Sequence, residues 1–284
     1  MRILLLGASG YVGGVLWREL SQRHTVVGTC SARPVPGLVT LDLRDRAALR
    51  GLLATGFDLV VHAAGLVDLS AAEQQPELAS ELNAGSVVAL REAVRGSGTR
   101  ILLLSTDNVF DGTADQYTET DTRNPVNVYG HTKREAEDAL LGEDALLGED
   151  GHLIVRIPLV YGRSPFADRF MARFASPVTR AQVDVVCAPL YLPSLAPALE
   201  QLWDRTGLLH LGGAEVMTRY ALMSRIVDHL GLPTEVVAVR NDEAFPVPRR
   251  PARLVLRSAR HDLLGPDLDT ALADLAGSGP ADRP

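Results

Sequence analysis

Short runs of hydrophobic residues alternate with stretches of helical periodicity over roughly the first 160 residues. The runs are apolar at successive positions, as is typical of parallel strands buried on both faces. They predict strands at Ile3–Leu6, Thr25–Thr29, Leu59–His62, Ile101–Ser105 and Leu153–Ile157. The periodic stretches predict helices at Tyr11–Gln22, Asp45–Ala54, Gln75–Arg95 and Val126–Leu147. Repeated strand–helix units favour an α/β fold, a doubly wound parallel sheet with right-handed crossovers.

The pattern changes after residue 162, where the alternation weakens and proline becomes frequent. A helix at Arg219–Leu230 and an extended segment at Glu235–Val239 are predicted there. We therefore expect a first domain over residues 1–162 and a smaller C-terminal lobe over residues 163–276, interleaved with the end of the first domain. Residues 277–284 have the composition of a disordered tail. A tandem hexapeptide at 138–149 is expected to lengthen or fray the end of a surface helix.

Composition narrows the class of protein. The net charge of −7 disfavours nonspecific binding to nucleic acid or to anionic membranes. The first apolar run stops at Gly7 and is too short for a signal peptide or a membrane span. The two cysteines, Cys30 and Cys187, form neither a metal-type cluster nor a disulfide framework, which suits the cytoplasm. No carboxylate or histidine cluster has metal-ligand spacing, so no metal is expected.

A glycine-rich loop, Gly7-Ala-Ser-Gly-Tyr-Val-Gly13, lies between the first predicted strand and the first predicted helix. Glycines let the backbone turn tightly and approach a pyrophosphate, whose charge the helix N-terminus stabilises. This context predicts a Rossmann-type dinucleotide-binding domain over residues 1–162. The expected phosphate-binding residues are Gly7, Ser9, Gly10, Tyr11, Val12 and Gly13. A glycine turn without a ligand is the alternative.

The segment after the second strand bears on which dinucleotide is bound. NAD-binding folds usually have an Asp or Glu about 20 residues after the glycine motif. Here the sequence is Gly-Thr-Cys-Ser-Ala-Arg33, so an arginine lies where a 2′-phosphate would sit. This favours NADPH, with NADH and a merely solvated Arg33 as alternatives. Asp42 and Leu43 follow a further extended segment, and Asp42 could accept a hydrogen bond from the adenine amine.

The chain contains a single lysine, Lys133, among its 28 basic residues. A position that keeps lysine where arginine is otherwise used suggests a need for a compact ammonium group. Tyr129 precedes it by four residues and would share its face of a helix. A nearby cation favours phenolate, so we expect the pKa of Tyr129 to fall toward neutrality. A codon bias that spared one lysine by chance is the alternative.

Hydroxyl groups at Ser105 and Thr106 end the fourth predicted strand, at the sheet edge where such folds bind ligands. With the glycine loop, the segments Ser105-Thr-Asp-Asn-Val-Phe-Asp-Gly112 and Pro125-Val-Asn-Val-Tyr-Gly-His-Thr-Lys133 resemble the extended short-chain dehydrogenase/reductases. They are most similar to the dTDP-4-dehydrorhamnose reductase group, which includes the regulatory subunit of methionine adenosyltransferase. The resemblance covers nearly the whole chain.

The resemblance implies roles for residues at these positions. Thr106 and Tyr129 would act on a carbonyl oxygen, and Lys133 would hold the nicotinamide ribose and lower the pKa of Tyr129. Asp107 and Asn108 would face the substrate, although Asp107 could instead anchor its loop. Residues around the third strand would also contact the cofactor, namely Ala63, Ala64 and Gly65. We expect His62 to be a neutral packing histidine.

Three segments depart from the sugar reductases on the substrate side: Leu69-Ser-Ala-Ala-Glu73, Cys187-Ala-Pro-Leu-Tyr-Leu-Pro-Ser194 and Arg250-Pro-Ala-Arg-Leu-Val-Leu256. Polar groups that could bind a sugar or pyrophosphate are replaced by apolar groups or change sign. This favours a different, less polar carbonyl substrate. Tyr191, Arg250 and Arg253 are expected to select it.

The sequence thus predicts NADPH-dependent reduction of a ketone to an alcohol. The default small-molecule substrate is a nucleotide-linked 4-keto-6-deoxy sugar or another biosynthetic carbonyl intermediate. A sugar-nucleotide epimerase or dehydratase on the same fold, and a non-catalytic cofactor-binding regulatory subunit, are the alternatives. Related reductases are often dimers, so a homodimer stays open, whereas neither nucleic acid nor a membrane is an expected partner.

Overall fold

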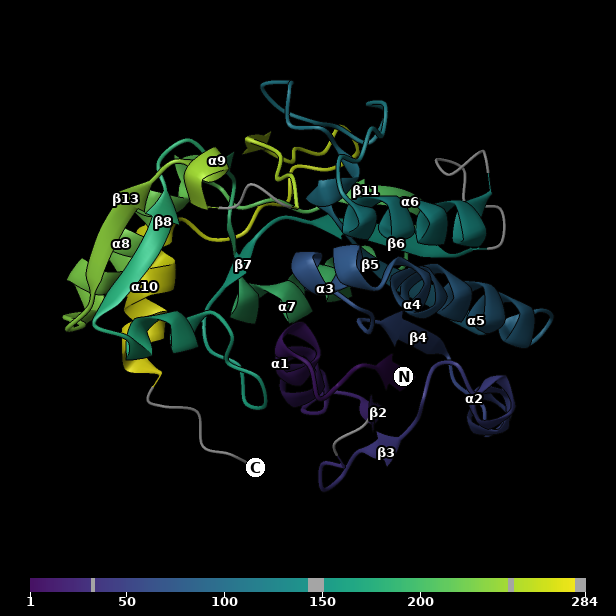
Figure 1. Cartoon of the computed structure of the whole chain (residues 1–284). Helices are drawn as coiled ribbons and strands as arrows, with labels where there is room; N and C mark the ends of the chain where they lie inside the picture. Colours follow the sequence, from purple (N-terminus) through teal and green to yellow (C-terminus); the bar gives the residue numbers. More distant parts are fainter. Residues whose placement is uncertain (32–33, 143–150, 245–247, 279–284) are drawn as a thin grey trace.

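The computed structural model describes residues 1–31, 34–142, 151–244 and 248–278. A seven-stranded parallel sheet lies at its centre, with strand order β11-β6-β5-β4-β1-β2-β3 (Figure 1). Its strands are β1 Arg2–Leu6, β2 Thr25–Cys30, β3 Val39–Thr40, β4 Leu59–His62, β5 Arg100–Thr106, β6 Leu153–Ile157 and β11 Gly207–His210. The predicted Rossmann-type α/β fold is confirmed. All five strands predicted over the first domain are present within two residues of their expected ends.

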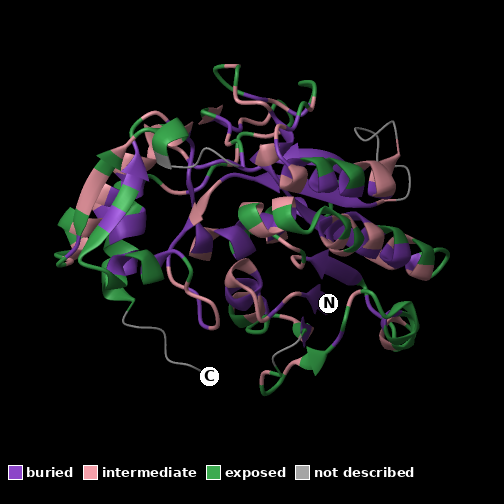
Figure 2. Cartoon of the chain, viewed as in Figure 1, coloured by how far each residue is buried: buried purple, intermediate pink, exposed green. Residues whose placement is uncertain are grey.

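Helices cover both faces of this sheet because its strands are apolar on both sides. Ile3 and Leu5 pack in one core, with α1 (Tyr11–Leu20) and α7 (Leu195–Leu202). Leu4 and Leu6 point to the opposite core. That second face is covered by α2 (Arg46–Leu53), α5 (Ser86–Val94) and α6 (Val128–Leu141). The central strands are accordingly buried (Figure 2).

The helix predicted at Gln75–Arg95 is present from Pro76 to Val94, as α4 (Pro76–Ser80), a π-helical turn at Glu81–Gly85 and α5, and the sequence did not predict the π-turn. A short helix that was not predicted, α3 (Leu69–Gln74), precedes it. The turn directs Asn83 inward, where its Oδ1 accepts from the Leu66 N–H at 2.8 Å and its Nδ2 donates to Thr132 at 2.9 Å. A π-turn inserts a residue into a helix. Here the amide side chain holds the loop after β4 in place.

Helix α6 begins at Val128, two residues later than predicted, because the Asn127 side chain accepts from the Gly130 N–H at 2.8 Å and caps it. The helix ends at Leu141, and most of the hexapeptide repeat lies in residues 143–150, outside the described residues. The last helix, α10, spans Leu268–Gly277. Residues 279–284 of the predicted tail are likewise outside the described ranges.

A second lobe packs β8 (Val178–Gln182) in parallel beside β13 (Glu235–Val239). Helices α8 (Arg219–Leu230) and α10 share its core; α8 and β13 have their predicted bounds. Five short strands form two small sheets that are separate from the central one. In the first, β7 (Val160–Tyr161) pairs with β10 (Leu190–Tyr191). In the second, β9 (Val186–Cys187) lies between β12 (Met217–Thr218) and β14 (Arg253–Leu254). The chain also forms α9 at Asn241–Ala244. Since α7 and β11 return to the central layer, a boundary at residue 162 stays a prediction.

A buried ion pair joins α6 to β6. Arg156 donates from Nε to Glu137 Oε1 at 2.8 Å and from Nη2 to Glu137 Oε2 at 2.6 Å, and each side chain is 1% exposed. Ser105 donates to the same carboxylate at 2.5 Å, and Arg123 at 3.2 Å. Burial opposes ionisation of Glu137, but Arg156 and the Ser105 hydrogen bond hold its pKa below its usual range. Arg156 also donates to His210 Nε2 on β11 at 3.1 Å.

Replacing Arg156 with methionine should therefore leave the buried Glu137 carboxylate without its bidentate partner, with only the longer 3.2 Å contact to Arg123 and the Ser105 hydrogen bond. We expect Arg156→Met to lower the free energy of unfolding by about 3–5 kcal/mol, measured by urea denaturation at pH 7. Arg134→Met is the matched control, since Arg134 lies on α6 and its one ion pair within the described residues is an exposed 3.9 Å contact with Asp138. That control should change the free energy by less than about 0.5 kcal/mol. Equal losses in the two variants would contradict the role of the pair.

No helix in the described ranges combines the length and the apolar character that a membrane crossing requires.

Candidate functional site

The glycine loop packs backbone against backbone between β1 and α1. Gly7 adopts φ +87°, a conformation that favours glycine. A Cβ on Gly13 would lie 2.0 Å from the Gly7 carbonyl oxygen, and one on Gly7 would lie 2.8 Å from Ala64 Cα. Gly10 is the N-cap of α1 and supplies no capping side chain, so the first N–H groups of the helix are available to an anion.

This loop fits the diphosphate of a dinucleotide. Its predicted residues Gly7, Ser9, Gly10, Tyr11, Val12 and Gly13 all lie at the start of α1. The Tyr11 side chain itself is used elsewhere, because its hydroxyl donates to the Gly162 carbonyl at 2.8 Å. Only the backbone N–H of Tyr11, and not its side chain, is therefore available to bind a phosphate.

The sequence predicts three residues near the adenosine half of the cofactor, Arg33, Asp42 and Leu43. Arg33 is outside the described residues. Asp42 follows β3 as expected, but both its oxygens accept from the Arg44 guanidinium, which holds its pKa at about 2. An adenine contact would have to compete with that exposed pair. Leu43 packs against the core under α2 and α5.

Residues that follow β4 pack against the glycine loop. Gly65 adopts φ +145°, and a Cβ there would lie 2.3 Å from Asn83 Oδ1. Ala63 and Ala64 precede it, and Ala64 touches the glycine loop. His62 is buried, and its Nε2 lies 3.0 Å from Ser86 Oγ. Burial lowers the pKa of His62 to about 3, so the ring is a neutral packing residue.

Thr106, Tyr129 and Lys133 meet where β5 ends against α6. Thr106 ends β5, and its hydroxyl is near enough to Tyr129 to favour the phenolate, while Lys133 reaches back and donates from Nζ to the Leu104 carbonyl at 2.8 Å. Burial lowers the pKa of Lys133 to about 8, and the nearby Glu137 carboxylate opposes that shift. The arrangement brings a hydroxyl, a phenol and an ammonium group to one edge of the sheet.

The expected fall in the pKa of Tyr129 is wrong for this structure. Burial raises the pKa of Tyr129 to about 12, and the hydrogen bond with Thr106 opposes the rise only in part. Tyr129 is therefore protonated at neutral pH. Helical spacing places Lys133 on the same face, but its ammonium group is directed to Leu104.

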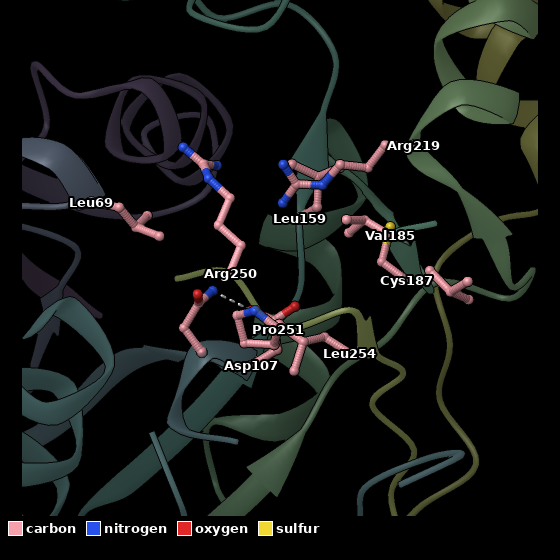
Figure 3. A pocket seen from close by; sticks show the side chains of 11 residues that line it. Leu69, Asp107, Leu159, Val185, Cys187, Arg219, Arg250, Pro251 and Leu254 are labelled. Atoms are coloured by element: carbon pink, nitrogen blue, oxygen red, sulfur yellow. Dashed lines mark hydrogen bonds between the residues drawn. The ribbon is translucent and has the colours of Figure 1, made fainter. Parts of the chain in front are cut away.

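A pocket opens beside this edge, lined by the turn at Asp107–Val109, by β9 and by the start of α8 (Figure 3). Asp107 and Asn108 line it, as predicted, and Asp107 Oδ1 accepts from Thr106 at 3.1 Å and from Asn108 at 2.9 Å. Burial raises the pKa of Asp107 to about 6, and the positive charge of Arg219 opposes the rise. Arg250 also lines the pocket.

Two of the residues expected to select the substrate lie elsewhere. Tyr191 is buried, and its hydroxyl donates to Asp274 at 2.6 Å within the second lobe. Arg253 donates to the Asp115 carbonyl at 2.8 Å, away from the pocket lining. Adjacent side chains on a strand point to opposite faces, so Leu254 enters the pocket and Arg253 does not.

Arg219 is a pocket residue that the motifs did not identify. A signal was present, since the helix predicted at Arg219–Leu230 begins with a cation, and cations are unfavourable near a helix N-terminus. Among the described residues, no group of three His, Cys, Asp or Glu side chains could hold a metal ion.

A seven-stranded parallel Rossmann sheet, a glycine loop and a Tyr-x-x-x-Lys helix define the extended short-chain dehydrogenase/reductases, which are NAD(P)-dependent oxidoreductases. Residues 1–267 match the model of the RmlD substrate-binding domain family, and the chain belongs to that family.

Curated relatives of two kinds match the chain. The dTDP-4-dehydrorhamnose reductase of Mycolicibacterium smegmatis is 31% identical, over 91% of this chain and 79% of its own length. The methionine adenosyltransferase 2 subunit beta of Mus musculus is 29% identical, over 93% of this chain and 82% of its own. The solved dTDP-4-dehydrorhamnose reductase of Bacillus anthracis, in complex with NADP, has a TM-score of 0.82 at 20% identity, covering 96% of this chain and 98% of that one. This last likeness supports the fold alone.

Gly13→Ala should weaken cofactor binding because the new Cβ would meet the Gly7 carbonyl oxygen at 2.0 Å. We expect its dissociation constant for NADPH, measured by fluorescence titration, to rise by more than about tenfold, or 1.4 kcal/mol. In the control Gly51→Ala, on α2, nothing lies within 4 Å of the new Cβ. The control should keep its affinity and gain about 0.4–1 kcal/mol of stability. Unchanged binding by a cooperatively melting Gly13→Ala would argue against this phosphate site.

The lowered pKa of Lys133 predicts a pH-dependent stability. Since the folded pKa is about 8 and the unfolded one 10.5, the folded state releases this proton first, and wild-type stability gains from pH 8 to 10.5. Lys133→Met removes that gain. The difference in unfolding free energy, variant minus wild type, should fall by about 2–3 kcal/mol between about pH 7 and pH 10. Parallel pH profiles in urea denaturation would show that Lys133 has an ordinary pKa.

Proposed function

We propose that this protein catalyses NADPH-dependent reduction of a ketone to an alcohol. The observation that supports the proposal most is that Tyr129 on α6 lies beside Thr106, the last residue of β5, while Lys133 of the same helix donates to Leu104 of that strand. Asp107, the next residue after Thr106, lines a pocket. The substrate we favour is a nucleotide-linked 4-keto-6-deoxy sugar or another biosynthetic carbonyl intermediate, in line with the M. smegmatis relative.

The residues of this chain would supply the proton and the positioning. A bound dihydronicotinamide supplies a hydride to the carbonyl carbon. The Tyr129 hydroxyl donates its proton to the carbonyl oxygen, and Thr106 donates a hydrogen bond to the same oxygen. With a pKa of about 12, Tyr129 carries that proton throughout the neutral range. Tyr129 then regains a proton from solvent, so one hydride and one proton convert the ketone to the alcohol.

NADPH is the preferred cofactor in this proposal. No Asp or Glu follows β2 within Ser31–Arg33 to bind a ribose 2′-hydroxyl, and the solved B. anthracis reductase is in complex with NADP. A cytoplasmic location fits the two free, buried cysteines Cys30 and Cys187. A homodimer is part of the proposal only by analogy with related reductases.

Tyr129→Phe tests the proposal. With a nucleotide-linked 4-keto-6-deoxy sugar or a panel of ketones, followed by NADPH absorbance, kcat should fall by about 10²–10⁴. NADPH affinity should be unchanged. Tyr117→Phe is the control, since the Tyr117 hydroxyl donates to Asp111 at 2.8 Å outside the pocket lining and its loss should leave kcat unchanged. Wild-type turnover that survives in Tyr129→Phe would contradict the role of Tyr129.

A regulatory subunit is the second candidate. The relatives that favour it are the methionine adenosyltransferase 2 beta subunits, at 29% identity in Mus musculus. This function predicts that NADPH binds while no carbonyl compound is turned over by either wild type or Tyr129→Phe. An epimerase or dehydratase would differ again, because such enzymes retain the cofactor and would purify with it bound.

A further inference from the structure

Helix α6 takes part of its N-terminal capping from another helix. The first N–H groups of a helix have no partner within it, so they need acceptors from elsewhere. The N-cap Asn127 accepts from the Gly130 N–H through its own side chain. Val128, the first residue of the helix, donates its N–H instead to Glu73 Oε1 on α3, at 2.8 Å. Two side chains from different elements thus complete one helix start.

The charge of Glu73 also suits this position. Helix α6 has no acidic residue in its own first turn. The N-terminus of a helix is the positive end of its dipole, which a nearby carboxylate stabilises. Glu73 therefore supplies from α3 the negative charge that the sequence of α6 lacks. Its hydrogen bond with Val128 is charge-assisted, and such bonds are stronger than those between neutral groups.

The first turn of α6 packs tightly against the turn that follows β5. A Cβ on Gly130 would lie 2.2 Å from the Asn108 carbonyl oxygen, so only glycine allows this approach. The contacted turn spans Asp107–Val109 and comes directly after Thr106. Tyr129 immediately precedes Gly130 in the helix. Any shift of this first turn therefore moves the Tyr129 hydroxyl relative to Thr106.

The start of α6 is tied to two segments that line the pocket. Helix α3 begins at Leu69, which lines the pocket, and contacts α6 through Glu73. On the other segment, the Arg249 carbonyl accepts from Asn127 Nδ2 at 3.1 Å, and the next residue, Arg250, lines the pocket. The elements that surround a substrate thus also hold the helix that carries the proton donor.

We propose that Glu73 is a positioning residue for the reduction, and that its cap on Val128 holds the first turn of α6 where the Tyr129 hydroxyl reaches the carbonyl oxygen. Glu73 is not among the residues that line the pocket, so it acts through α6 rather than on the substrate. Proton transfer requires heavy atoms within about 2.6–3.2 Å of each other, and a displacement of about 1 Å can cost about 10²-fold in rate. The inference rests on the proposed ketoreductase function and adds a residue to it.

Two substitutions of Glu73 test this role in steady-state kinetics with NADPH and a ketone that wild type reduces. Glu73→Ala removes the acceptor, and we expect kcat to fall by about 10–100-fold while KM and the NADPH dissociation constant stay within about twofold of wild type. Glu73→Gln keeps a carbonyl acceptor and should retain kcat within about threefold. Rescue by glutamine and the selective loss of kcat separate positioning from a general loss of stability. If Glu73→Ala does not fold, Glu73→Asp, which is one methylene shorter, should show a smaller fall in kcat at unchanged KM.

Glu135→Ala is the matched control. The Glu135 carboxylate also joins α6 to a neighbouring helix, since it accepts from Ser80 of α4 at 3.0 Å, but it is exposed and lies beyond the first turn. This variant should keep the wild-type kcat. Hydrogen exchange of the Val128 amide, followed by NMR, reports the cap without any turnover. Exchange should be at least about tenfold faster in Glu73→Ala than in wild type, and unchanged in Glu135→Ala.

The positioning role is overturned if wild type reduces a ketone and Glu73→Ala keeps its kcat, or if the Val128 amide exchanges equally fast in both. Failure of the proposed function gives a different result. Wild type would then bind NADPH and reduce no ketone, although Glu73 still protects the Val128 amide. That outcome overturns the reductase, and the positioning role with it, while the cap itself stays in place.

Discussion

The buried pair of Glu137 and Arg156 is the interaction on which the candidate site depends, because it fixes α6 against the sheet. Tyr129, Lys133 and Glu137 follow at i, i+4 spacing, so one face of α6 carries both the chemistry and its anchor. Removing two charges from water costs several kcal/mol per ion. Hydrogen bonds from Ser105 and Arg123 offset part of that cost by occupying the remaining carboxylate positions. The Glu137–Arg156 pair therefore serves mainly to position α6 and adds little net stability to the fold.

The same carboxylate governs the charge of Lys133. Burial favours the neutral amine, and Glu137 is the group that opposes this by favouring the ammonium form. Because Lys133 also donates to the Leu104 carbonyl, its position is tied to β5, the strand that ends in Thr106. The phenol of Tyr129 stays protonated one turn earlier on the helix. A proton donor and a cation are thus held at fixed separation by contacts that lie behind the site.

Features that depend on residues near one another in the chain can be predicted from the sequence. Features that depend on tertiary contacts cannot. Apolar runs identify the central strands, and the glycine spacing identifies the phosphate loop, because both depend on near neighbours in the chain. The π-turn inside the helix expected at Gln75–Arg95 is not predicted, because it accompanies bonds from Asn83 to Leu66 and Thr132, which are distant in the chain. The expected fall in the pKa of Tyr129 is wrong for a similar reason. The spacing reveals Lys133 but not the burial of Tyr129, which raises the pKa. Tyr191 is misplaced because nothing nearby in sequence reveals Asp274.

The glycine loop and the pocket recognise charge by different means. This explains why only the glycine loop can be predicted from the sequence. The glycine loop offers backbone N–H groups and a helix dipole, which a short motif specifies completely. The pocket takes its charges from residues 107, 219 and 250, which only the fold brings together. The Glu137–Arg156 pair behind α6 involves none of these pocket residues, so the charges on the substrate side can change without altering the contacts that hold Tyr129 and Lys133.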